Sequence, residues 1–213
     1  MSGAASVCWA LIPIKGSGEG KTRLSGALDA AGRVALVNRM LERVVTAAGD
    51  CPAVARICLV GPDDHGLGGA IHRIEDRGAD LNSALAAAVA QVEEDGARIA
   101  EGAATTAASR LLIIAADLPR IDGRDIAMLA AVPETAVGIA PDRHGTGTNA
   151  LSLPIAAASA FRFRFGQGSY AAHRAEAERL GYTVETILSD GLEKDVDEPA
   201  DVADARDCLK GAL

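Results

Sequence analysis

The chain has 213 residues, of which 49 % are hydrophobic and only 3 % aromatic, and its formal net charge at pH 7 is -8. This length predicts one domain, residues 1–213, whose core is built from Ala, Val, Leu and Ile. The acidic balance argues against nucleic acid as a partner, and no apolar stretch approaches the roughly 20 residues that span a membrane. Scattered cysteines and the lack of a basic leader before the first apolar run indicate a cytoplasmic protein, and a homodimer is left open.

Short apolar segments of strand length alternate with longer amphipathic segments. The predicted strands are residues 7–14, 56–60, 111–115, 136–140, 148–153 and 182–188. The predicted helices are residues 27–48, 81–92, 124–129, 169–180 and 199–209, where apolar residues recur at helical spacing. Residues 96–109 have no clear period and are predicted to be a surface insertion. The alternation predicts an α/β fold with a mainly parallel sheet and helices on both faces.

The first predicted strand leads into a glycine-rich, cationic loop that carries Lys15, Lys21 and Arg23. Glycine lets the backbone approach a ligand closely, and three cations in an acidic chain suit a polyphosphate. The pattern G-x-x-x-x-G-K-[ST] of a P-loop does not fit, because its first glycine would stand where the chain has Lys15. The loop is therefore predicted to hold phosphates in another way, and a solvated polar turn is the alternative.

Three aspartates are candidate ligands of a divalent cation. Asp117 follows the predicted strand 111–115, which would hold its carboxylate rigidly at the sheet edge. Asp195 and Asp197 stand two residues apart, so in an extended segment they face the same side and repel unless a cation lies between them. The alternatives are that Asp117 caps the next turn and that Asp197 is the N-cap of the last helix.

A second anion site is predicted around residues 161–169. All three phenylalanines of the chain fall within residues 161–165 and alternate with Arg162 and Arg164. Alternation of this kind packs the rings on one side and leaves the guanidinium groups available on the other. Gly166 and Gly168 then lead into a helix that begins near Ser169, whose free N–H groups favour an anion. An edge strand with solvated arginines is the alternative.

Weaker signals come from two further polar segments. Thr148 and Asn149, after the loop 142–147, are candidates for lining the site, and Asn82 is a candidate for contacting a base. Asp80 or Asn82 is expected to cap the helix 81–92. The four histidines show no ligand spacing and are predicted to be surface or helix residues.

A cationic loop, carboxylates for Mg²⁺ and a second anion site together indicate nucleotidyl transfer. A phosphate monoester is mostly dianionic at pH 7, so as an acceptor it attacks without a general base. Such a site requires charge neutralisation and in-line positioning.

Seven motifs in order resemble the 2-phospho-L-lactate guanylyltransferase family of coenzyme F420 biosynthesis, called phosphoenolpyruvate guanylyltransferases in bacteria. The motifs are Pro13-x-Lys15, Lys21-Thr22-Arg23-Leu24, Ala116-Asp117-Leu118-Pro119, Pro141-Asp142, Gly147-Thr148-Asn149-Ala150, Phe163-Arg164-Phe165-Gly166-x-Gly168-Ser169 and Asp195-Val196-Asp197. The glycine-rich centre of the first loop and the segment 96–109 depart from the family pattern.

The resemblance implies a Rossmann-like nucleotidyltransferase fold, similar to that of the molybdenum cofactor guanylyltransferases. It implies transfer of GMP from GTP to the phosphate of phosphoenolpyruvate, 2-phospho-L-lactate or 3-phospho-D-glycerate, with release of pyrophosphate. The implied Mg²⁺ ligands, for two ions, are Asp117, Asp195 and Asp197. The implied acceptor site comprises Thr148, Asn149, Arg164, Gly166 and Ser169, and the implied nucleotide site comprises Pro13, Lys15, Lys21, Arg23 and Asn82.

Two other functions are considered. A molybdenum cofactor guanylyltransferase would open with an L-x-G-G-x-S-x-R-M-G-type loop, which this chain lacks. A regulatory module that binds the nucleotide without turnover would not need all three aspartates.

Overall fold

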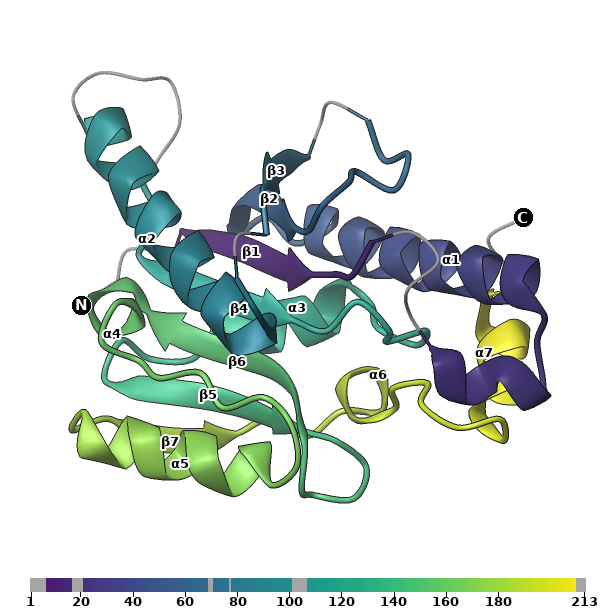
Figure 1. Ribbon diagram of the computed structural model, residues 1–213. Coiled ribbons are helices and arrows are strands. Elements are labelled where there is room, and N and C mark those ends of the chain that lie inside the picture. The colour runs from purple at the N-terminus through teal and green to yellow at the C-terminus, as the bar shows by residue number, and fades with distance from the viewer. Residues whose placement is uncertain (1–6, 17–20, 69–70, 77, 101–106, 210–213) are drawn as a thin grey trace.

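The computed structural model describes residues 7–16, 21–68, 71–76, 78–100 and 107–209, and within them a 7-stranded sheet with the order β3-β2-β1-β4-β6-β5-β7 (Figure 1). β6 runs antiparallel to β4 and β5, and the other strand pairs are parallel. The predicted α/β fold with a mainly parallel sheet is confirmed. The strands are β1 (Cys8–Pro13), β2 (Val54–Val60), β3 (His72–Ile74), β4 (Arg110–Ile114), β5 (Ala136–Pro141), β6 (Thr148–Pro154) and β7 (Thr183–Thr186).

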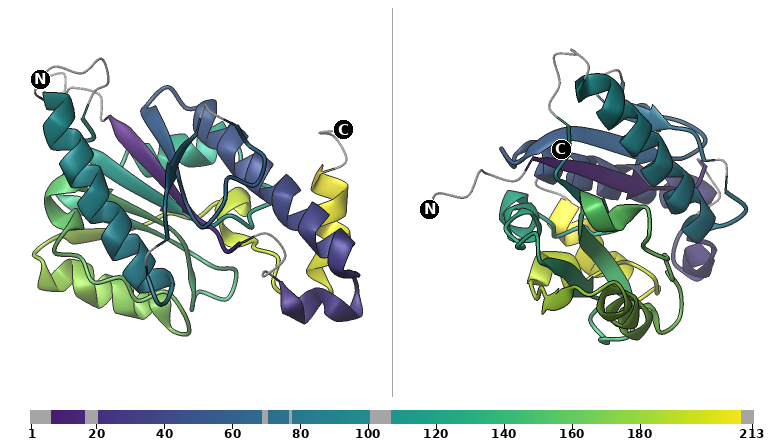
Figure 2. Two further views of the ribbon diagram at one scale, coloured as in Figure 1. Left: turned by 45° about the horizontal axis from the view of Figure 1, so that its top comes forward. Right: turned by 90° about the vertical axis from the view of Figure 1, so that its left-hand side faces the viewer.

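Helices cover both faces of the sheet, as the alternating burial of β1 requires. Cys8, Ala10 and Ile12 pack into a core with α1 and α3, whereas Trp9 and Leu11 pack into a second core with α2 and α5 (Figure 2). The helices are η1 (Thr22–Gly26, a 3₁₀ helix), α1 (Ala30–Gly49), α2 (Leu81–Ala100), α3 (Gly123–Ala130), α4 (Ile155–Ala158), α5 (Ser169–Arg179), α6 (Asp190–Glu193) and α7 (Asp201–Leu209).

A third apolar cluster holds η1 and α7 against the first half of α1. Leu24 of η1 and Val196 before α7 are both buried in it, together with Leu36, Met40 and Val202. Figures 1 and 2 show these three helices side by side at one end of the molecule. Segments from the beginning and the end of the chain therefore meet there.

Several predicted boundaries are wrong. The helix predicted over residues 81–92 continues to Ala100, so residues 96–100 are helical rather than part of an insertion, and residues 101–106 lie outside the described residues. Polar residues interrupt the apolar pattern after Val92, but residues 93–100 include Glu, Ala and Arg, which are good helix formers. β3 was not predicted, because three residues are too few to show a period.

The carboxyl ends of the parallel strands point toward η1, α6 and α7 (Figure 1). Because β6 runs in the opposite direction, its first residue, Thr148, lies at this same edge. Ala150 stands opposite Ile114, and the Ala115 N–H donates to the Asn149 carbonyl at 2.8 Å. The start of β6 thus lies beside the segment that carries Asp117. Among the described residues, none of the helices combines the length and apolar character needed to cross a lipid bilayer.

Candidate active site

Three carboxylates from two segments meet at this edge. One oxygen each of Asp117, Asp195 and Asp197 lies within 4.8 Å of the others. Asp117 comes from the turn after β4, and the other two come from the extended segment between α6 and α7. Val196 between them is only 1 % exposed because it packs beside Leu24, and this burial turns both neighbours away from the core.

Lys21 lies among these carboxylates. Its Nζ donates to Asp117 Oδ2 and, at 2.8 Å, to Asp197 Oδ1. The backbone of Lys21 is left-handed, with φ 58°, immediately before η1 begins at Thr22. This conformation is unfavourable for a residue with a Cβ and is retained where the surroundings or function require it. The strained turn here aims the ammonium group at the three aspartates.

The electrostatics of the cluster favour added positive charge. Burial lowers the pKa of Lys21, but Asp117 and Asp197 outweigh it, so the pKa is raised overall and the ammonium stays charged. Burial raises the pKa of Asp195, and the charges of Asp117 and Asp197 raise it further. One ammonium therefore offsets only part of the charge of three carboxylates.

The donor set fits Mg²⁺. Mg²⁺ prefers oxygen ligands at about 2.1 Å in octahedral geometry, so adjacent ligands lie about 3.0 Å apart and opposite ligands about 4.2 Å apart. Carboxylate oxygens within 4.8 Å of one another can approach these separations by side-chain rotation. Asp117, Asp195 and Asp197 are the residues that would hold the ion.

The segment with Asp195 and Asp197 is fixed from the far side by Asp201. The Asp201 carboxylate accepts hydrogen bonds from the N–H groups of Asp197, at 3.0 Å, and Glu198, at 2.8 Å. Arg143 donates to both oxygens of Asp201, at 2.6 and 3.0 Å. Because α7 begins at Asp201, the alternative that Asp197 is its N-cap is wrong.

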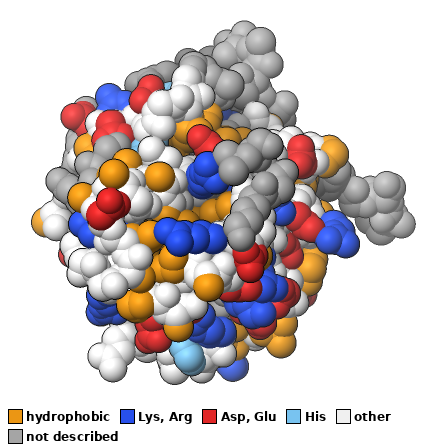
Figure 3. Space-filling model, turned by 90° about the vertical axis from the view of Figure 1, so that its right-hand side faces the viewer, with side chains coloured by type: hydrophobic (Ala, Val, Ile, Leu, Met, Phe, Trp, Pro, Cys, Tyr) orange, Lys and Arg blue, Asp and Glu red, His pale blue; other side chains and the backbone are white. Residues whose placement is uncertain are grey.

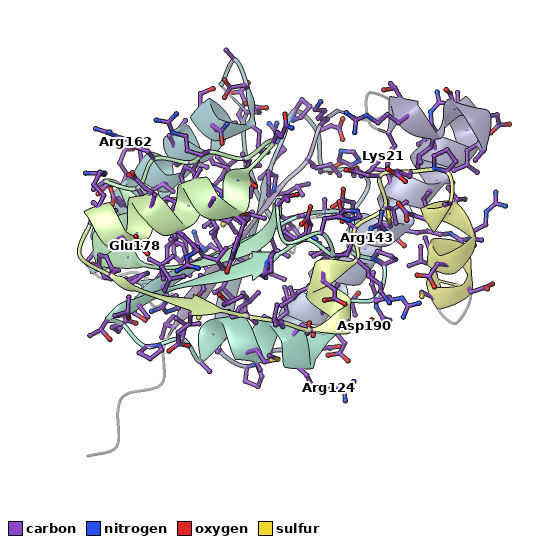
Figure 4. All side chains as sticks on the ribbon, turned by 90° about the horizontal axis from the view of Figure 1, so that it is seen from below. Lys21, Arg124, Arg143, Arg162, Glu178 and Asp190 are labelled. Carbon is purple, nitrogen blue, oxygen red and sulfur yellow. The ribbon has the colours of Figure 1, made fainter. Side chains whose placement is uncertain are left out.

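Arg143 is not among the predicted site residues, because its partner Asp201 stands 58 positions away in the sequence. Figure 4 shows Arg143 and Lys21 at the same end of the molecule, whereas Arg162 and Glu178 lie at the other end. Figure 3 shows basic and acidic side chains interspersed on the face toward which the parallel strands point.

A second group of predicted residues gathers where β6 and α5 begin. Thr148 and Ser169 are 7 % and 1 % exposed. Gly168, with φ 72°, precedes the first turn of α5 and supplies no side chain to cap it. The loop 142–147 reaches this point too, since the Tyr170 N–H donates to the Thr146 carbonyl at 3.1 Å.

His173 joins the parts of this second group. Its Nδ1 lies 3.0 Å from Thr148 Oγ1, and its Nε2 accepts from the Arg164 N–H at 3.0 Å. The ring is fully buried, and this burial lowers the pKa of His173 to about 4. His173 is a helix residue, as expected, although its burial was not predicted. The expectation of a surface or helix residue is wrong for His65, which lies in a turn and whose side chain is 1 % exposed.

The segment 161–165 alternates as predicted, but it is not a strand. Phe161 and Phe163 are buried, whereas Arg162 and Arg164 are exposed. Side chains rather than a neighbouring strand bind its backbone: the Arg162 N–H donates to Glu176 Oε1 at 3.0 Å. The alternative of an edge strand is therefore wrong, although the arginines are solvated.

Two predicted site residues bind the backbone of the protein. The Asn82 amide donates to the Phe165 carbonyl at 3.2 Å and accepts from the Phe165 N–H at 2.7 Å. The Asn149 amide donates to the Leu192 carbonyl at 2.9 Å. Asn82 thus fastens Phe165 to α2, and its contact with a base stays a prediction. The helix is capped by Asp80, whose carboxylate accepts from the Ser83 N–H.

The cationic loop is described only at its two ends, because residues 17–20 lie outside the described residues. Lys15 and Arg23 are exposed, at the exit of β1 and in η1. The Lys15 carbonyl lies 3.0 Å from His65 Nε2, and Pro13 ends β1. Of the three predicted cations, Lys21 is thus the one found at the carboxylates.

Solved structures that share this fold include nucleotidyltransferases. One is a structure of CMP:2-keto-3-deoxy-manno-octonic acid synthetase in complex with CTP. The superposition covers 98 % of this chain and 100 % of the synthetase chain, with a TM-score of 0.64 and 14 % sequence identity. A nucleotidyl transferase from Methanothermobacter matches 97 % and 99 %, with a TM-score of 0.64 and 13 % identity. At these identities the likeness establishes the fold, which is the predicted nucleotidyltransferase fold.

Sequence comparisons define the family within this class. A family model described as "Guanylyl transferase CofC like" matches residues 8–206. Phosphoenolpyruvate guanylyltransferase from Sphaerobacter thermophilus is 35 % identical over 198 residues, which cover 91 % of this chain and 89 % of the relative. The enzyme of the same name from Rubrobacter xylanophilus is 34 % identical over 203 residues, covering 92 % and 91 %. The chain therefore belongs to the CofC-like guanylyl transferase family and is a nucleotidyltransferase, which confirms the predicted family and class.

Proposed function

We propose that this protein transfers GMP from GTP to the phosphate of a three-carbon phosphorylated acid in coenzyme F420 biosynthesis. A phosphate oxygen of the acceptor attacks the α-phosphorus of GTP, the bond to the bridging oxygen breaks, and pyrophosphate leaves. Phosphoenolpyruvate is the first acceptor to test, because the relatives carry its name. 2-Phospho-L-lactate and 3-phospho-D-glycerate are the alternatives.

The observation that supports this proposal most strongly is the cluster of Asp117, Asp195, Asp197 and Lys21. When bound, Mg²⁺ would neutralise phosphate charge and orient the reacting groups. In our proposal Lys21, Lys15 and Arg23 neutralise the triphosphate. The strained backbone of Lys21 supports such a role, because it positions a permanent cation beside the proposed ligands.

The acceptor is proposed to bind where β6 and α5 begin. Thr148, Gly166 and Ser169 would hold it. The expectation that the Ser169 end of α5 has free N–H groups is wrong for its first two residues, because the Ser169 and Tyr170 N–H groups donate to the Gly166 and Thr146 carbonyls, so the proposal rests on the side chains and on Gly166. The β4–β6 register supports this arrangement, because it brings the start of β6 beside the turn with Asp117. A dianionic phosphate needs no general base, and the buried, neutral His173 fits a site that works without one.

The test is pyrophosphate release from GTP with Mg²⁺ and each acid in turn, with mass detection of the product. Asp117→Asn should lower turnover by at least about 100-fold, since even outer-shell partners of a metal are worth 10- to 100-fold. Glu42→Gln removes an equal charge from an exposed position of α1 and should leave turnover unchanged. No product with any of the three acids, or equal turnover in Asp117→Asn, would contradict the proposal.

A further inference from the structure

His173 links the two segments that the proposed function assigns to the acceptor. It lies on α5 and contacts Thr148, at the start of β6, and the backbone of Arg164, just before Gly166. The ring of Phe165 meets it edge-on, with centroids 4.8 Å apart. Its burial and two-sided bonding fix the orientation of the imidazole.

The two hydrogen bonds also fix which nitrogen carries the proton. A backbone N–H can only donate, so Nε2, 3.0 Å from the Arg164 nitrogen, must be the unprotonated nitrogen. Burial keeps the ring neutral, because it lowers the pKa of His173 to about 4 despite the nearby Glu176. Glu176 itself is paired with Arg179. A neutral imidazole has one proton, which is therefore on Nδ1 and is donated to Thr148 Oγ1.

This assignment determines what the Thr148 hydroxyl can offer a ligand. Having accepted a hydrogen bond from His173, the hydroxyl keeps its own proton for donation. Within the described ranges, no second partner of this hydroxyl is found. With the opposite tautomer, Thr148 would donate to the ring and turn its lone pairs to the ligand, which would repel an anion.

We propose that His173 is a positioning residue of the acceptor site: its Nδ1–H tautomer makes Thr148 a hydrogen-bond donor to an anionic oxygen of the phosphorylated acid. The proposal rests on the proposed function, which places the acceptor at Thr148. His173 does not touch the acceptor, and it acts through the hydroxyl of Thr148. Its Nε2 side holds the Arg164 backbone independently.

Two substitutions separate these actions. In His173→Asn the amide nitrogen replaces Nδ1, so the bond to Thr148 is kept and the bond from Arg164 is lost. In His173→Gln the amide oxygen replaces Nε2, so the bond from Arg164 is kept and the bond to Thr148 is lost. We expect His173→Gln to raise the KM for the acid by about 10-fold, the value of one hydrogen bond to a charged group, with the KM for GTP changed less than about 2-fold. His173→Asn should stay within about 3-fold of wild type.

A double-mutant cycle tests whether His173 acts through Thr148. Thr148→Val removes the hydroxyl and keeps the shape of the side chain. In that background His173→Gln should change the KM for the acid by less than about 2-fold. If the two substitutions together raise the KM for the acid by the product of their separate effects, or if the KM for GTP rises equally, His173 has a general structural role and the proposal is overturned.

The tautomer has a readout that does not depend on activity. Long-range ¹H–¹⁵N NMR of the ¹⁵N-labelled wild type, assigned with His173→Gln or His173→Asn, should show a protonated Nδ1 and an unprotonated Nε2 at pH 7. A protonated Nε2 would overturn the proposal, even if one variant fails to fold. A wild type inactive with all three acids refutes the proposed function, whereas an active wild type with an unchanged His173→Gln refutes only this inference.

Discussion

Removing the ammonium of Lys21 should destabilise the fold, and added Mg²⁺ should restore the stability. Lys21→Met keeps most of the apolar stem of the side chain but removes the ammonium group that donates to Asp117 and Asp197, next to Asp195. The side chain of Lys21 is only 14 % exposed, so solvent replaces little of the lost interaction.

The size of the effect follows from the geometry. Two unit charges 4.8 Å apart repel by about 3.5 kcal/mol at an effective dielectric constant of about 20. Protonating one aspartate at pH 7 costs about 4 kcal/mol and limits the total penalty. Asp197 is 50 % exposed, and this screening reduces its share. We expect the free energy of unfolding to fall by about 2–3 kcal/mol.

The measurement is urea unfolding at pH 7, followed by circular dichroism, with EDTA and with saturating Mg²⁺. With EDTA the free energy of unfolding of the variant should fall by the full expected amount. With Mg²⁺ it should regain more stability than wild type gains, because the ion takes over the neutralisation that the ammonium provided. Lowering the pH should reduce the difference in the free energy of unfolding between the wild type and Lys21→Met, since protonated carboxyl groups no longer repel one another.

The control is Lys194→Met. Lys194 pairs with the exposed Asp190 and lies outside the cluster, so its loss should change stability by less than about 0.5 kcal/mol. The reasoning is refuted if Lys21→Met with EDTA costs no more than this control, or if Mg²⁺ stabilises the variant less than the wild type.

Three further outcomes are expected. Gly168→Ala should lower the free energy of unfolding in urea by about 1 kcal/mol, because φ at Gly168 is 72°. Gly26 has equally open surroundings and no positive φ, so Gly26→Ala should change the free energy of unfolding by less than about 0.5 kcal/mol. Equal losses in the two variants would contradict this reasoning. The pKa of His173 is about 4 in the folded protein and near 6.5 in the unfolded chain, so its contribution to the free energy of unfolding is complete above pH 6.5 and is lost as the pH falls through 4. In His173→Gln the free energy of unfolding should therefore fall by up to about 3 kcal/mol less between pH 6.5 and pH 4 than in wild type. The same pH dependence in both proteins would argue against a buried neutral ring. Asp195→Asn should raise the Tm measured with EDTA at pH 7. Burial and two neighbouring carboxylates raise the pKa of Asp195, which means that its charged form destabilises the folded protein. A lower Tm would contradict this prediction.

Local signals in the sequence predicted the residues that gather at the sheet edge. Asp117 follows a run of buried strand residues, and the alternation around Val196 places Asp195 and Asp197 on one side. Such patterns depend on neighbouring residues only, so they can be recognised without the fold. The alternating burial of Phe161 and Phe163 was predictable for the same reason.

Contacts between distant segments could not be predicted in this way. The amide of Asn149 binds the Leu192 carbonyl, and Arg143 binds Asp201, because the reversed β6 and the loop before it meet α6 and α7. Nothing near His173 indicates burial, since its helix has polar residues around its circumference. Its role emerges only when β6 is placed beside α5.

The ion pairs of Lys21 join residues 96 and 176 positions apart in the chain. Closing loops of this length costs entropy before any contact compensates it, so these pairs are expected to form late in folding. During synthesis, the first strand and the left-handed turn leave the ribosome long before Asp197 does. A nascent chain that stops short of this aspartate can build much of the sheet, but its carboxylate cluster stays incomplete.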